Sequence, residues 1–169
     1  MKYTLTFRSQ IEALKGIIVI TFSFMAISVL FRYALDSFFP SSIILLIIYL
    51  LFYFIPVIIL HINYIKYARG RVLIVGSDFI TYDNQTYSID EIVSIEVFST
   101  SQHKKNGSGA RTLAHNEYYY FIQINFRNEE KIIINSLLGQ NIDRYLISKF
   151  PDLAVKYHLH FFRRLLITK

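Results

Sequence analysis

The chain has 169 residues, a formal net charge of +6 and no cysteine. The absence of cysteine excludes disulfides, thiolate metal sites, iron–sulfur clusters and cysteine nucleophiles. Hydrophobic residues make up 53% of the chain, a larger share than in an ordinary soluble domain.

The first residues predict a strand and then the start of a helix. Apolar and polar side chains alternate from Tyr3 to Arg8, which is the period of a half-buried strand. The segment Ser9-Gln-Ile-Glu12 fits a capping box, with Ser9 as the N-cap and Glu12 at the third helical position. We therefore expect residues 1–9 to add a strand to a sheet elsewhere in the chain.

Two uncharged apolar runs follow, at residues 16–31 and 43–60. A charge-free stretch of roughly 18 or more residues is long enough to cross a bilayer as a helix. The prediction is a transmembrane hairpin over residues 10–65. A cleaved signal peptide is the alternative for the first run. It is disfavoured because no A-x-A-like site follows and a second run comes soon after.

The expected helices of this hairpin cover about residues 10–35 and 42–65. Pro56 lies inside the second helix, where it should kink the helix and free a carbonyl group. Lysine and arginine flank the hairpin on one side, at Lys2, Arg8, Lys15, Lys66, Arg69 and Arg71. The positive-inside rule therefore places both termini in the cytoplasm.

Residues 66–152 read as short strands and then a helix. Six runs have the composition of strands with turns between them, at 71–75, 79–82, 86–89, 92–98, 118–126 and 131–135. Apolar residues then recur at helical spacing until Pro151. Because residues 2–8 need a partner sheet on the same side of the membrane, we expect seven antiparallel strands closed by a C-terminal helix.

This pattern resembles a known family of small bacterial membrane proteins with two helices and a PH-like domain, of the YcxB-like type. The resemblance lies in KYTLTFRSQIE before the first span, GRVLIVGSDFITYDNQTYSIDEIVSIEV after the second, and YFIQINFRNEEKIIINS. It implies an α+β membrane protein, in which a two-helix transmembrane hairpin carries a cytoplasmic PH-like antiparallel β-barrel with a C-terminal helix. Phosphoinositide-binding PH domains carry a basic cluster at their first hairpin. At the turn taken as comparable this chain has Gly76-Ser77-Asp78, so inositol-phosphate recognition is not supported.

Charge separates the domain from the tail. In residues 66–152, ten lysines and arginines balance ten aspartates and glutamates, which argues against nucleic acid as a partner. The tail, residues 153–169, is basic and contains Lys156, Arg163 and Arg164. It is predicted to be an amphipathic helix on the surface of anionic lipid. The alternative is a last helix or strand that packs on the barrel.

The loop from Ser99 to Asn116 offers a candidate site for an anion or a partner. Lys104, Lys105 and Arg111 lie beside two glycines whose backbone amides could approach an anion. The loop lacks the GxxxxGK[ST] pattern of a phosphate-binding loop, and a solvated loop without a ligand is the favoured alternative.

No motif predicts catalysis, a metal or a cofactor. The sequence contains no G-x-S-x-G, and His158 and His160 lack further ligands nearby. We therefore expect a non-enzymatic binding or scaffold module that meets the lipid bilayer and engages a protein partner or lipid. A membrane immunity protein that neutralises a toxin is the alternative, and a homo-oligomeric pore or transporter component is the weakest.

Overall fold

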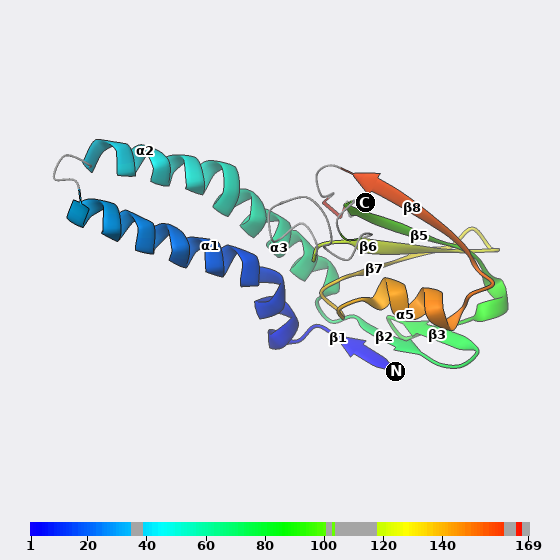
Figure 1. The fold of residues 1–169 in the computed structure, drawn as a ribbon. Helices are drawn as coiled ribbons and strands as arrows, with labels where there is room; N and C mark the ends of the chain where they lie inside the picture. Colours follow the sequence, from blue (N-terminus) through cyan, green and yellow to red (C-terminus); the bar gives the residue numbers. More distant parts are fainter. Residues whose placement is uncertain (35–38, 101–102, 104–117, 161–164, 167–169) are drawn as a thin grey trace.

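The computed structural model describes residues 1–34, 39–100, 103, 118–160 and 165–166. A long pair of antiparallel helices leads into a domain of two sheets and a short helix (Figure 1). The first helix of the pair is α1 (Phe7–Ala34). The second runs through α2 (Phe39–Tyr49), a π-helical turn (Leu50–Phe54) and α3 (Ile55–Ala68).

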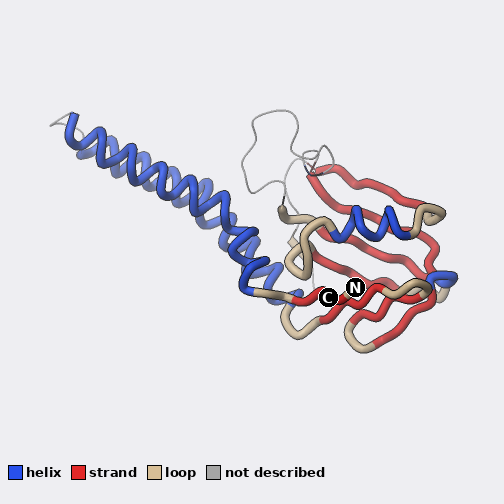
Figure 2. The backbone as a smooth tube through the Cα atoms, turned by 60° about the horizontal axis from the view of Figure 1, so that its bottom comes forward, coloured by secondary structure: helices blue, strands red, loops and turns tan. Residues whose placement is uncertain are grey.

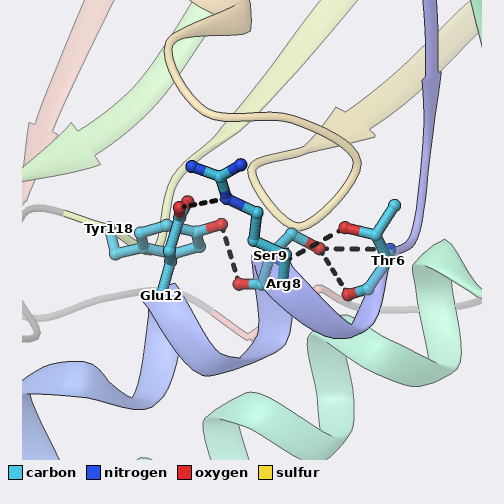
Figure 3. Close-up of polar contacts among 5 residues, drawn as sticks. All are labelled: Thr6, Arg8, Ser9, Glu12 and Tyr118. Carbon is cyan, nitrogen blue, oxygen red and sulfur yellow. Dashed lines mark hydrogen bonds and ion pairs between the residues drawn. The ribbon is translucent and has the colours of Figure 1, made fainter.

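The start of α1 differs from the prediction, because Thr6 and not Ser9 caps the helix. The Ser9 N–H donates to Thr6 Oγ1 at 3.1 Å, and the Thr6 N–H donates back to Ser9 Oγ at 3.2 Å (Figure 3). This reciprocal pair satisfies two donors at the helix end. Glu12 instead accepts a hydrogen bond from Arg8 Nε at 3.1 Å. The predicted capping box was therefore displaced by three residues.

The irregularity expected near Pro56 takes the form of a π-helical turn immediately before it. The Ile55 N–H donates to the Leu50 carbonyl, five residues back, where an α-helix would join residues four apart. Pro56 has no N–H to donate, so the series of backbone hydrogen bonds along the helix is interrupted at this residue.

Both helices of the pair are long and apolar enough to cross a membrane. The two candidate stretches are Phe7–Leu30 and Ile43–Ala68, and only 11% of an apolar 18-residue window in each is buried within the structure. A soluble domain rarely leaves so large an apolar surface open to water.

In the described part of the chain, eight strands form two sheets of four. The first has the order β1 (Lys2–Thr4), β2 (Val72–Val75), β3 (Phe79–Tyr82) and β4 (Gln85–Ser88). The second has the order β7 (Lys131–Asn135), β6 (Phe121–Phe126), β5 (Ile92–Thr100) and β8 (Ala154–His160). A 3₁₀ turn (Ile89–Glu91) joins the two sheets, and α5 (Ile142–Lys149) lies between β7 and β8 in the chain.

The N-terminal strand pairs with β2, as the sequence predicts. The two strands run antiparallel, with Lys2 opposite Ile74 and Thr4 opposite Val72. The helical pair is therefore inserted between two neighbouring strands of one sheet, and it projects from the domain where those strands meet (Figure 2). The expected strand over residues 2–8 is shorter in the structure, because α1 begins at Phe7.

The first part of the tail is not the amphipathic helix that was predicted. Residues Ala154–His160 form β8, which pairs in parallel with β5. Tail residues also alternate at a period of two, so the sequence fits either form. The open edge of β5 favours the strand over the helix, because pairing with β8 gives hydrogen-bond partners to backbone groups of β5 that would otherwise be exposed. Side-chain contacts of His158 also join β8 to β5. Its ring stacks on Phe98 with ring centroids 4.5 Å apart, and its Nε2 lies 3.1 Å from Glu96 Oε2.

One hydrophobic core joins the helices to the sheets. Ala13 of α1 and Leu60, Tyr64 and Ala68 of α3 belong to the same buried cluster as the inner residues of both sheets. The end of α3 is hydrogen-bonded there as well, because Asn135 Nδ2 donates to the Tyr64 carbonyl at 2.8 Å. The domain and the membrane-length helices are therefore one folded unit.

Candidate functional site

A pocket of about 340 Å³ lies between the end of α3, the β3–β4 turn and the start of β7. Tyr67 lies in the last turn of α3, and Arg71 lies in the short connection from α3 to β2. The remaining wall residues are Tyr82, Asp83, Gln85, Tyr87, Glu130, Lys131, Ile132 and Ile133. The pocket thus collects residues from three parts of the chain that only the tertiary fold brings together.

Arg71 is held in place by two tyrosines. Its guanidinium lies 4.0 Å from the centroid of the Tyr67 ring, and its Nη1 donates to the Tyr82 hydroxyl at 3.1 Å. A guanidinium over an aromatic face is stabilised by the ring quadrupole. The Tyr82 hydroxyl in turn donates to the Ile133 carbonyl at 2.6 Å, so this contact also links the two sheets.

The β3–β4 turn shapes one wall of the pocket. Asp83 and Asn84 have φ angles of 53° and 67°. A two-residue hairpin turn of type I′ requires positive φ angles at both central residues. Asp and Asn tolerate this region better than most residues. The turn places the Asp83 carboxylate 4.0 Å from Arg71 Nε, where it offsets part of the guanidinium charge.

The pocket is polar but formally neutral. Arg71 and Lys131 are balanced by Asp83 and Glu130, and three tyrosine side chains complete the lining. Burial raises the pKa of Tyr82 to about 12, against the opposing hydrogen bond and charge of Arg71. The hydroxyl of Tyr82 is therefore protonated at neutral pH. This set of groups suits a ligand that offers both donors and acceptors, such as a peptide segment.

Replacing Tyr82 with Phe is expected to destabilise the fold by about 1–3 kcal/mol at neutral pH. The substitution leaves the Ile133 carbonyl without its donor and Arg71 without its acceptor. Because the pKa of Tyr82 is raised in the folded state, its contribution is complete below pH 10 and is lost as the pH rises towards about 12. Unfolding free energies of both proteins, measured from pH 8 to 12, should converge in that window. A constant difference would show that the Tyr82 hydroxyl is not the cause.

A second cluster joins the segment after β5 to α5. His103 Nε2 lies 2.7 Å from Asp143 Oδ2, and both side chains are almost fully buried. The Tyr120 ring stacks on His103 with centroids 4.0 Å apart, and Arg144 donates to the His103 carbonyl at 3.1 Å. Burial raises the pKa of Asp143, but the hydrogen bond and charge of His103 outweigh it, and the net pKa is lowered. The cluster fixes His103 against α5.

Most of the predicted site residues lie outside the described residues. These are Lys104, Lys105 and Arg111 of the loop and Arg163 and Arg164 of the tail. Lys156 is described: it is exposed on β8, in register with Glu96 of β5.

The turn at 76–78 lies where the sequence predicts it, between the strands expected at 71–75 and 79–82. It joins β2 to β3, whereas the first connection of the sheet, from β1 to β2, is the helical pair itself. The comparison of Gly76-Ser77-Asp78 with the first hairpin of phosphoinositide-binding PH domains stays a prediction.

Sequence reasoning missed the residues that form the pocket and the buried cluster. Arg71 was considered only as a flanking charge for topology, and Tyr82 only as a residue of a short strand. The one local signal is the closeness of Arg71 to the end of the apolar run. His103 gives no such signal, because its partner Asp143 lies 40 residues away.

Comparison with known proteins agrees with this architecture. The family model described as PH domain matches residues 2–143, from β1 through the inserted helices to the start of α5. No curated protein and no solved structure matches the chain. Strand β8 lies beyond the matched range and extends the second sheet. The match covers most of the sequence, and the chain therefore belongs to the PH domain family.

Proposed function

We propose that this protein is a membrane-anchored, PH-like binding module of the YcxB-like type, held at the cytoplasmic face of the bacterial inner membrane. The observation that carries the proposal is the core shared by the exposed apolar helices and the sheets. Such a core holds the domain, without a linker, where the helices leave the bilayer.

Two features support the proposed topology. The pairing of β1 with β2 requires the chain before α1 and the chain after α3 to lie on the same side of the membrane. Lysine and arginine are concentrated on that side, and the positive-inside rule makes it the cytoplasm. The alternative orientation would place these charges on the outer side.

The pocket between α3, the β3–β4 turn and β7 is the proposed binding site, and a protein partner is the proposed ligand. Its balanced charges and three tyrosines favour a peptide segment over a highly charged phosphate group. No catalytic step is proposed for it.

Site-specific crosslinking tests this function. A photoreactive residue at Gln85, in the pocket, should give a defined crosslinked product in intact membranes. The same residue at Val93, which is 53% exposed and does not line the pocket, is the matched control. Arg71→Ala should abolish the product while the protein stays resistant to alkaline extraction. Equal products from both positions, or a product that survives Arg71→Ala, would contradict the assignment of the pocket.

A further inference from the structure

The lipid-facing side of α3 changes from apolar to basic near the domain. Ile55, Ile59 and Ile62 are 44%, 53% and 47% exposed. Their spacing of three and four residues places them on one face of the helix. The same spacing continues to Lys66 and to Arg69 just after the helix, and both are exposed. One continuous stripe therefore runs from isoleucine to positive charge.

A similar stripe lies on α1 and runs in the opposite direction along the chain. Phe22, Ile18 and Ile11 are 68%, 40% and 45% exposed, at positions that share a face. Lys15 is exposed between Ile18 and Ile11 on that face. The first helix therefore also carries a basic residue on its exposed apolar side, near the domain.

The two stripes reach the same depth. Ile17 of α1 packs in one small cluster with Val57 of α3, and the helices are antiparallel (Figure 1). Ile11 and Ile62 lie five or six residues closer to the domain than this contact, and so at nearly equal depth. From Ile11 to Tyr33, and from Ile43 to Ile62, each helix extends about 30 Å at 1.5 Å per residue. This length matches the hydrocarbon core of a bilayer.

The basic residues of the stripes therefore fall at the headgroup layer. Lys66 and Arg69 lie one and two turns beyond Ile62. Lys15 lies one turn inside Ile11, a distance that a lysine side chain spans when it extends its ammonium towards the interface.

Among the described residues, these charges have no acidic partner in an ion pair. Arg8 is compensated by Glu12, whose carboxylate lies 3.1 Å from Arg8 Nε (Figure 3). In the part of the chain that the structure describes, no carboxylate forms an ion pair with Lys15, Lys66 or Arg69.

We propose that Lys15, Lys66 and Arg69 form a basic collar that binds the phosphate groups of anionic lipids where the helices enter the domain. The collar holds the membrane-facing side of the domain against the headgroup layer. This inference rests on the proposed membrane anchoring, and it adds a lipid class that the anchored protein selects.

Lipid selectivity of the full-length protein tests the collar. The protein is reconstituted into phosphatidylcholine vesicles that contain spin-labelled phosphatidylglycerol or spin-labelled phosphatidylcholine. The relative association of each probe is measured by electron paramagnetic resonance. Wild-type protein should prefer phosphatidylglycerol several-fold, and added salt should reduce the preference. Each removed charge should weaken it by about fivefold or less. K66Q/R69Q should therefore lose most of the preference.

The matched control is R127Q/K149Q, which removes two charges from the domain outside the collar and should keep the preference. Equal loss in both variants would show a general charge effect and overturn the collar. No preference in the wild-type protein would overturn it too. These outcomes differ from a failure of membrane anchoring, in which alkaline extraction would release the wild-type protein from the vesicles.

Discussion

Deletion of Lys2–Thr4 is expected to destabilise the whole domain, although these residues precede a helical pair of about 60 residues in the chain. The deletion removes β1 and exposes the edge of β2, whose backbone groups lose their partners. It also removes Tyr3, which packs edge-on against Tyr145 of α5 with ring centroids 6.0 Å apart. Thr6 and Ser9 remain, so the cap of α1 is retained.

Hydrogen exchange in detergent micelles measures this effect. Amides of Val72–Val75 should exchange much faster in the deletion variant, and the temperature of domain unfolding should fall. Lys2→Ala is the control, because it removes only an exposed side chain and keeps the strand. Unchanged protection of β2 in the deletion variant would show that β1 contributes little to the sheet. A folded fragment of residues 66–152, as stable as the domain in the full chain, would contradict the shared core.

Tyr64→Ala is expected to lower the free energy of unfolding by about 3–5 kcal/mol, the usual cost of removing a buried aromatic side chain. Tyr64 is 1% exposed and packs edge-on against Tyr119 with ring centroids 5.2 Å apart. Its loss leaves a cavity at the contact between α3 and the second sheet. Since domains are stable by only about 5–15 kcal/mol, the variant is expected to be partly unfolded at moderate temperature.

Thermal unfolding followed by the near-ultraviolet circular dichroism of the tyrosines measures this loss. The midpoint should fall by about 10 °C for a chain of this size. Ile62→Ala is the matched control: it lies on the same helix but is 47% exposed, so it should change the midpoint by little. Similar shifts for both variants would mean that α3 contributes through the detergent or lipid contact and not through the shared core.

Local patterns determined most of the elements. The apolar runs predicted both long helices. Period-two alternation predicted β1 and β5, and strand-like composition between turn residues predicted the other strands from β2 to β7. Pro151 was correctly expected to stop the preceding helix, which ends at Lys149. The pairing of residues 2–4 with the domain also followed from the sequence. A lone half-buried strand requires a partner, and the flanking lysines and arginines predicted that the N-terminus and the domain lie on the same side of the membrane.

Errors arose where two local choices have similar energy. Thr6 and Ser9 can both cap a helix, and the short β1 leaves room for α1 to begin at Phe7. Once Ser9 lies inside the helix, its carbonyl accepts a hydrogen bond from the Tyr118 hydroxyl at 3.0 Å (Figure 3). That contact spans 109 residues and has no sequence signal.

The sequence by itself determined that the chain has two helices of membrane length and a series of short strands, because these follow from the hydrophobic pattern and composition of each segment. The PH-like layout followed from a resemblance to a known family, and the family match over residues 2–143 supports it. Only the tertiary structure decided that residues 154–160 of the tail form strand β8, since the open edge of β5 outweighs their helical pattern. The structure alone also placed Arg71 between Tyr67 and Tyr82, and His103 against Asp143. Contacts of this kind depend on which sheets and helices meet, and hydrophobic period carries no information about them.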